Sequence, residues 1–127
     1  MFVAAVTVIV PDYAAGLAFY VGQMGFDLIE DTDMGAGKRW VLVAPPGSSE
    51  CRILLAKAAG PDQTGAIGKQ AGGRVFLFLQ TDEFAADHAR MQAAGVTFLE
   101  EPRHETYGSV AVFCDPFGNK WDLLQRR

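Results

Sequence analysis

Several residue types and patterns that mark large protein classes are scarce in this chain of 127 residues. It has only two cysteines, Cys51 and Cys114, and no Cys/His spacing typical of a metal site, so neither a zinc ribbon nor a disulfide scaffold is indicated. No apolar run approaches the roughly 20 residues of a membrane span, and Met1-Phe2-Val3 lacks the basic start of a secretory signal. We therefore expect a cytoplasmic protein with two buried, reduced thiols.

Positive charge is also scarce. Lysine and arginine number 11 against 15 aspartates and glutamates, and the formal net charge is -4. Nucleic acids and anionic membranes require a basic surface, so the composition argues against both as partners and favours a small molecule or a protein. The length and the 50% share of hydrophobic residues suit one domain, residues 1–127.

The most informative stretch lies near the end of the sequence. Asp115-Pro-Phe-Gly-Asn119 combines a proline, which presets φ, with Gly-Asn, which accepts positive φ, so the pattern predicts a tight turn. Apolar, β-rich runs flank this turn, and together they predict a β-hairpin. The second run, Lys120-Trp-Asp-Leu-Leu124, places the carboxylate of Asp122 inside an apolar strand. That carboxylate faces either water or a concave binding surface.

The first half of the chain reads as a β-α-β-β-β unit. Asp12 is a good N-cap, and apolar residues then recur at helical spacing until Gly25 ends the helix. The segment from Asp31 to Gly37 is predicted to be a turn. The predicted strands of this unit are residues 3–10, 26–30, 39–44 and 51–56.

The second half repeats this order after a crossover rich in glycine and polar residues, 57–73. A strand is predicted at 74–80, a cap at Thr81 or Asp82, a helix at 84–94 and a further strand at 96–99, before the terminal hairpin. A shift of 70 residues superposes Asp12 on Asp82 and Gly25 on Gly95. The sequence thus predicts an α+β fold in which unit one (1–56) and unit two (74–127) are tandem βαβββ units. They form a curved eight-stranded cup with the helices outside.

The chain resembles the vicinal oxygen chelate superfamily, which includes glyoxalase I, bleomycin-resistance proteins and extradiol dioxygenases. The resemblance covers nearly the whole sequence and implies the cup-shaped fold, whereas the functions within this superfamily are diverse. The motifs that carry it are Val8-Ile-Val-Pro-Asp12, Leu17-Ala-Phe-Tyr20, Gly25-Phe26, Tyr107-Gly108, Asp115-Pro-Phe-Gly-Asn119 and Trp121-Asp122-Leu123.

Metal-using members of this superfamily hold their ion with four ligands, and the resemblance places these positions in the sequence. The two early-strand positions fall on Ala5 and Val75, the last-strand position of unit one lies within 52–54, and the fourth falls on Asp122. Only Asp122 offers a ligand atom, whereas transition-metal sites need about three or four. We therefore predict no metal at the family's position and no cofactor.

Without a metal, the floor of the cup should be apolar. Strand alternation predicts that the side chains lining it are those of Ala5, Thr7, Ile9, Val75, Leu77 and Leu79. A mostly apolar surface with a few polar groups is typical of small-molecule sites.

Five residues are the polar or aromatic candidates for substrate binding: Arg39, Trp40, His104, Tyr107 and Asp122. Each has a structural alternative. His104 could be a solvent-exposed loop residue, Trp40 could belong to the core, and Asp122 could be satisfied by Arg39 or a hydroxyl.

Catalytic candidates are fewer. A metal-free enzyme would need a base and a polarising donor, and His104 with Asp122 or Tyr107 is the only plausible set. His88 is predicted to be a half-buried packing residue, and Trp121 should face the helices.

Three functions remain open from the sequence. The leading hypothesis is a protein, homodimeric by its resemblance to the family, that binds an apolar or aromatic small molecule in a metal-free cup. The first alternative is a glyoxalase- or dioxygenase-like metalloenzyme with a rearranged site that uses His104, Asp122 and either Glu105 or His88. The second alternative is an interaction module without catalytic activity.

Overall fold

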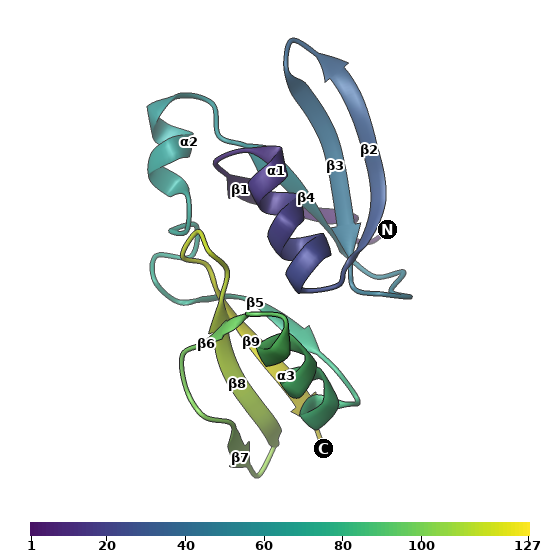
Figure 1. Ribbon diagram of the computed structural model, residues 1–127, viewed down its shortest axis with the longest axis vertical. Helices are drawn as coiled ribbons and strands as arrows, with labels where there is room; N and C mark the ends of the chain where they lie inside the picture. The colour runs from purple at the N-terminus through teal and green to yellow at the C-terminus, as the bar shows by residue number, and fades with distance from the viewer. The chain divides into compact units, whose positions relative to one another are not determined.

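A computed structural model describes residues 1–127 and divides them into two compact units, Met1–Ile67 and Gly68–Arg127. Each unit consists of a β-sheet with a helix against one face, so the α+β class and the repeated unit are confirmed (Figure 1). The organisation as a single domain stays a prediction. No helix combines the length and apolar character that crossing a membrane would require.

The first unit has a four-stranded sheet of order β1-β4-β3-β2, in which β1 and β4 are parallel. The predicted crossover contains a short helix, which belongs to this unit. Its elements are β1 (Ala5–Val10), α1 (Tyr13–Leu17), a π-helical turn η1 (Ala18–Gln23), β2 (Asp27–Gly35), β3 (Lys38–Ala44), β4 (Arg52–Lys57) and α2 (Gly60–Ala66).

The predicted start and end of the first helix are confirmed. The Asp12 carboxylate accepts a hydrogen bond of 2.7 Å from the Ala15 amide, which satisfies a donor left unpaired at the helix start. At the other end Gly25 adopts φ 75°, and the Phe26 amide donates to the Tyr20 carbonyl.

The helix covers one face of the first sheet. Val8, Val10, Val41, Val43 and Leu55 are fully buried on that face. Gly16 allows this close approach, because a Cβ there would come within 3.3 Å of the Leu55 and Val10 side chains. The face turned away from α1, here called the open face, carries Ala5, Thr7, Ile9, Trp40, Leu42 and Leu54 by strand alternation and register.

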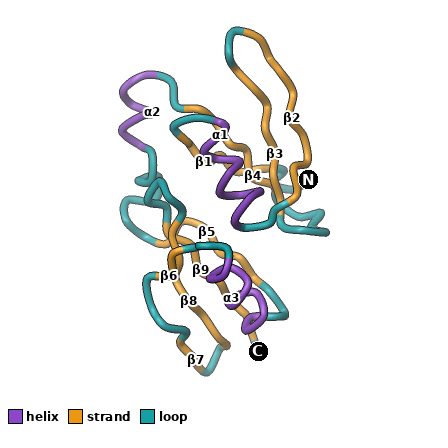
Figure 2. Tube along the Cα trace, in the orientation of Figure 1, coloured by secondary structure: helices purple, strands orange, loops and turns teal.

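The prediction of a turn from Asp31 to Gly37 is wrong. Strand β2 continues to Gly35, so only Ala36 and Gly37 form the turn, with φ values of 55° and 80° (Figure 2). Positive φ at both central residues is typical of the type I′ turn, which suits the twist of two paired strands. The acidic, Gly-containing segment resembled a loop, but its residues pair across to β3.

The second unit has five strands, one more than predicted, so the chain has nine strands in place of eight. Strand order is β5-β9-β8-β6, and β7 also pairs with β8. The strand expected at 96–99 is interrupted before Pro102, which lacks a backbone donor, and β7 resumes the pairing. The elements are β5 (Val75–Gln80), α3 (Phe84–Ala93), β6 (Thr97–Phe98), β7 (Arg103–Glu105), β8 (Gly108–Cys114) and β9 (Lys120–Arg126).

The predicted terminal hairpin is confirmed, with β8 and β9 antiparallel. The Asp115 side chain organises its turn from within, since it is only 3% exposed. Its Oδ1 accepts hydrogen bonds from the amides of Phe117 (3.0 Å) and Asn119 (2.9 Å), and its Oδ2 accepts from the Asn119 side chain (2.8 Å). The buried carboxylate therefore replaces water as the partner of these donors.

The gapless repeat is only partly correct. Helix α3 begins at Phe84 with Glu83 as its N-cap, so neither Thr81 nor Asp82 is the cap. Both units nevertheless end this segment at a glycine with positive φ, Gly25 and Gly95. The first unit therefore has one more residue between cap and glycine, and the wider π-helical turn η1 takes it up.

The predicted orientation of β5 is also partly wrong. A register shift between Val75 and Leu77 pairs Leu77 and Leu79 with Trp121 and Leu123, which are buried on the helix-covered face. Phe78, 63% exposed, pairs with Asp122 on the opposite face. Leu77 and Leu79 therefore lie on the side away from Asp122, whereas Val75 pairs with Lys120 and shares its face.

The prediction of two buried thiols holds for neither cysteine. Cys51 is exposed just before β4, and Cys114 is half-buried at the end of β8. Burial raises the pKa of the Cys114 thiol, which keeps it protonated to higher pH than an ordinary cysteine. Both thiols are free, as predicted.

Candidate functional site

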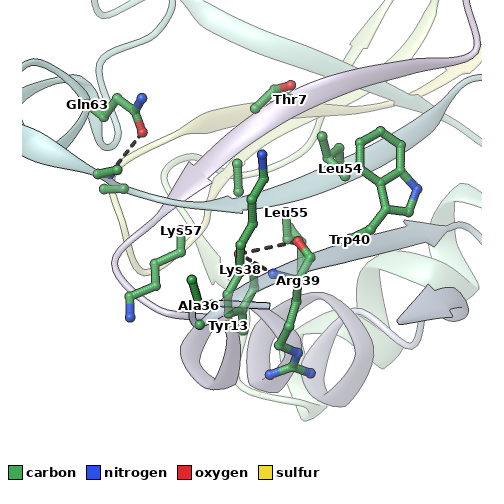
Figure 3. Close-up of a pocket in the computed structure, with 14 residues that line it drawn as sticks. Thr7, Tyr13, Ala36, Lys38, Arg39, Trp40, Leu54, Leu55, Lys57 and Gln63 are labelled. Carbon is green, nitrogen blue, oxygen red and sulfur yellow. Dashed lines mark hydrogen bonds between the residues drawn. The ribbon is translucent and has the colours of Figure 1, made fainter. Parts of the chain in front are cut away.

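A pocket opens in the first unit where strands β3 and β4 separate. Their pairing covers Val41–Val43 on β3 and Ile53–Leu55 on β4, although both strands extend further toward Lys38 and Lys57. The pocket, here called the slot, has a volume of about 530 Å³, which is in the range of small-molecule sites. Its lining residues are Thr7, Tyr13, Ala36, Gly37, Lys38, Arg39, Trp40, Leu54, Leu55, Ala56, Lys57, Ala58, Ala59 and Gln63 (Figure 3).

Tyr13 takes the place of the missing strand partner beside Arg39. The Arg39 amide donates to the Tyr13 hydroxyl at 2.9 Å, and the hydroxyl lies 3.3 Å from the Arg39 carbonyl. These contacts satisfy the edge of β3 where β4 no longer pairs with it. The first turn of α1 thereby forms one end of the slot.

Arg39 lines the slot, but its guanidinium points to the α1 side of the sheet (Figure 3). It lies 4.9 Å over the Tyr13 ring and forms hydrogen bonds to both carboxylate oxygens of Asp31, with Nε to Oδ1 at 3.0 Å. Hydrogen bonding to Arg39 lowers the pKa of Asp31, and the same contact raises the pKa of Arg39. The charge of Arg39 is thus already paired within the protein.

Trp40 and Lys38 lie on the other side of β3, as alternation requires. Trp40 is 38% exposed, and its ring shares the open side of the slot with Leu54 and Thr7, as Figure 3 shows. The sequence predicted Trp40 and Arg39 together as binding residues. The two side chains point to opposite sides of β3. Lys38 is the basic residue that accompanies Trp40.

Lys38, Lys57 and Gln63 were missed as candidates. Lys57 ends β4, and Gln63 is in α2, which lies inside the predicted crossover. The alternation of Lys38 with Trp40 was a signal in the sequence that could have identified this lysine. Nothing local indicated Gln63, because its place at the slot depends on how α2 packs.

The candidates of the second unit do not share one face of their sheet. His104 pairs with Ser109, and its Nδ1 lies 2.8 Å from the Ser109 hydroxyl. Its ring lies edge-on to Phe84 of α3 at 6.4 Å, so it is on the helix-covered face. Asp122 pairs with Val112, three residues along β8 from Ser109, and so points to the opposite face. The proposed pair of His104 with Asp122 is therefore not brought together.

Asp122 is half-buried, and its Oδ1 has no hydrogen-bond partner. Desolvation raises its pKa, Arg103 lowers it and Glu100 raises it. Arg103 itself forms hydrogen bonds of 3.0 Å to both carboxylate oxygens of Glu100. The alternative in which Asp122 pairs with Arg39 is wrong, because Arg39 binds Asp31.

Replacing Asp122 by asparagine is expected to stabilise the protein at neutral pH. Because the folded protein holds the Asp122 proton to higher pH than the unfolded chain does, unfolding releases a proton between the two pKa values. Stability therefore falls as pH rises through that window, and asparagine removes this loss. Urea denaturation at about pH 3 and pH 7 should show a gain for Asp122→Asn only at the higher pH. An equal gain in stability at both pH values would contradict the raised pKa of Asp122.

Tyr107 lies in the two-residue turn between β7 and β8 and is 52% exposed. The pKa of Arg103 is raised chiefly by its hydrogen bonds to Glu100, with a smaller contribution from Tyr107. Tyr107 thus lies near the guanidinium of Arg103. It has the exposure that a ligand contact requires.

The residues present do not fit the metal site that the resemblance implies. Ala5 lies on the open face of β1 and pairs with Arg52, and neither side chain is a usual metal ligand. Glu105 is paired with Arg103, and His88 is packed between Phe84 and Phe98, with ring centroids at 5.9 and 4.2 Å. No group of three or more His, Cys, Asp or Glu residues has the arrangement to hold an ion.

Two further predictions about orientation are confirmed. His88 is half-buried and packs against aromatic rings, as expected of a packing residue. Trp121 is 3% exposed and stacks on Phe113 at 5.8 Å on the helix-covered face. Both residues stabilise the core beneath α3 and are unavailable to a ligand.

Comparison with known proteins agrees with this architecture. An uncharacterized protein of Shewanella frigidimarina (strain NCIMB 400) is 53% identical over 121 residues, covering 94% of this chain and 90% of the relative. The crystal structure of UcmS2 superposes with a TM-score of 0.85 at 30% identity, covering 98% of this chain and 97% of that one. TnmS3, an antibiotic binding protein from Streptomyces sp. CB03234, has a TM-score of 0.79 at 34% identity, covering 100% and 97%.

A family model matches almost the entire sequence. The model described as Glyoxalase/Bleomycin resistance protein/Dioxygenase superfamily matches residues 3–123. This span includes both units and every element from β1 into β9. The chain therefore belongs to the glyoxalase/bleomycin resistance protein/dioxygenase superfamily.

Proposed function

We propose that this protein binds an apolar or aromatic small molecule without a metal ion, and that the slot of the first unit is part of the binding site. The observation that carries the proposal is the half-exposed Trp40 ring beside Leu54 in a cavity of about 530 Å³. Exposed aromatic side chains in a concave apolar site are the usual anchors of small ligands. The similarity to an antibiotic binding protein supports the same class of function.

A catalytic role has less support. His104 and Asp122, the base and acid of the enzymatic alternative, lie on opposite faces of one sheet. Glu105 and His88 are engaged in an ion pair and in aromatic packing. Homodimerisation and a cytoplasmic location remain parts of the proposal that rest on family resemblance and composition.

Trp40 provides a direct test, because the other tryptophan, Trp121, is buried. A panel of aromatic compounds should include members that protect Trp40 fluorescence from acrylamide and raise the melting temperature. At about 100 times its dissociation constant, a ligand adds near 2.7 kcal/mol to stability. Trp40→Ala should weaken binding by about tenfold or more, since it removes a large apolar contact.

Two controls accompany this test. Phe2→Ala removes an aromatic ring that is 82% exposed and outside the slot, so it should leave binding unchanged. Prior dialysis against EDTA should also change neither binding nor stability. If no compound in a broad panel protects Trp40, the proposal fails and an interaction module becomes the better explanation. Stoichiometric metal required for binding would contradict its metal-free form.

A further inference from the structure

We infer that the ligand of the slot carries an anionic group, such as a carboxylate, on its apolar or aromatic body, and that Lys38 binds this group. The inference rests on the proposed function and adds the charge of the ligand to it. It follows from the charges, hydrogen-bond groups and apolar surface that line the slot.

The slot is basic in an acidic protein. Its lining contains Lys38, Arg39 and Lys57 but no aspartate or glutamate, although the chain as a whole has a net charge of -4. Asp31 neutralises Arg39. Lys57 pairs with Val10 and shares its strand face with the buried Leu55, so it points to the α1 side, as Arg39 does (Figure 3). The Lys38 ammonium lies on the open side with Trp40 and has no ion-pair partner, so no carboxylate compensates its charge. Such a site attracts anions and repels cations.

The neutral groups around the slot offer donors as well. The Gln63 side-chain oxygen accepts a hydrogen bond of 2.8 Å from the Ala59 amide, which leaves its NH2 group as the free end. The Tyr13 hydroxyl is engaged by the Arg39 backbone. Lysine ammonium groups can only donate. A ligand that matches these side chains must supply acceptors, and a carboxylate supplies two oxygens for charge-assisted hydrogen bonds.

The remaining lining is apolar and suits a flat body. Trp40, Leu54, Leu55 and several alanines form its walls. A ring stacked on Trp40 would leave its substituent near Lys38, which lies on the same open side of β3. Partial enclosure by these walls strengthens an ammonium–carboxylate contact relative to one at an open surface.

Three probes with one ring system separate charge from shape: naphthalene-2-carboxylate, naphthalene-2-carboxamide and 2-naphthylmethylammonium. Isothermal titration calorimetry at low and high salt measures each with the full chain. The carboxylate is expected to bind about tenfold more tightly than the neutral carboxamide, and the ammonium compound most weakly. High salt should reduce the advantage of the carboxylate, because the exposed Lys38 ammonium remains partly hydrated.

Variants assign the effect to the slot. Lys38→Gln should weaken carboxylate binding by about threefold to tenfold while leaving carboxamide binding unchanged. Lys69→Gln, an exposed lysine outside the slot, should change neither. Glutamine keeps much of the aliphatic stem, so melting temperatures should stay close to that of the parent and verify folding.

The outcomes distinguish this inference from the proposed function. Equal binding of carboxylate and carboxamide, with Trp40 still protected, would overturn the anionic ligand and leave the apolar site intact. Carboxylate binding that Lys38→Gln does not weaken would also overturn the assignment. Failure of all three probes to bind would count against both proposals.

Discussion

Replacing Asp115 by alanine is expected to lower the free energy of unfolding by about 3 kcal/mol, because it leaves buried donors without an acceptor. The carboxylate accepts from the amides of Phe117 and Asn119 and from the Asn119 side chain, in a turn where Asp115 and Asn119 are 3% and 2% exposed. Water cannot replace those contacts without opening the turn. Urea denaturation monitored by Trp121 fluorescence measures the loss.

The control for this variant is Asp62→Ala, which removes an exposed carboxylate in α2 and should change stability by less than about 0.5 kcal/mol. The loss in the free energy of unfolding for Asp115→Asn should lie between those of Asp115→Ala and Asp62→Ala. Its side-chain oxygen can still accept from both amides, but its NH2 group would meet the Asn119 NH2 group at the position of Oδ2. A loss below about 1 kcal/mol for Asp115→Ala would show that the turn forms without this carboxylate.

Replacing Gly68 by alanine should destabilise the same turn from outside, by about 3 kcal/mol or more. Gly68 has φ 71°, and a Cβ there would come within 2.0 Å of the Phe117 carbonyl oxygen, so backbone atoms must move. The cost combines the left-handed conformation with a clash that side-chain rotation cannot relieve. Thermal and urea denaturation of Gly68→Ala report the combined effect.

Two other glycines serve to separate the cost of the left-handed backbone conformation from the cost of the steric clash. Gly72 has φ 64° and open space around its Cβ position, so Gly72→Ala should cost about 1 kcal/mol, for the backbone conformation alone. Gly65 lies in α2 with neither constraint, and Gly65→Ala should be neutral or stabilise the protein by up to about 1 kcal/mol. If Gly68→Ala costs no more than Gly72→Ala, close packing against Phe117 is not maintained in solution.

Local chemistry was enough to predict much of the fold. Asp12 and Gly25 mark the first helix because capping and positive φ depend on nearby residues, and Asp115–Asn119 specifies its hairpin for the same reason. The length of β2 and the orientation of β5 were mispredicted. Both depend on pairing with another strand, and the register shift that turns Leu77 and Leu79 toward α3 has no signature in β5 itself.

The site was less predictable than the fold. Trp40 lines the slot, and its role in binding stays a prediction. The slot itself exists because β3 and β4 stop pairing at Val41 and Leu55. The separation of β3 and β4 depends on how both strands pack with α1, so no single segment of the sequence predicts it. Arg39 and His104 were chosen for their chemistry, whereas strand alternation turns both toward helices. Applying alternation to each candidate would have exchanged Arg39 for Lys38.

Tyr13 has a further consequence at the slot. A β-strand with unpaired backbone groups invites another polypeptide to add to the sheet, which leads to aggregation. The Tyr13 phenol covers this vulnerable stretch of β3 at Arg39, and the guanidinium over its ring helps to hold it there. The Tyr13 side chain thus allows a gap between β3 and β4 while discouraging the addition of a foreign peptide to β3.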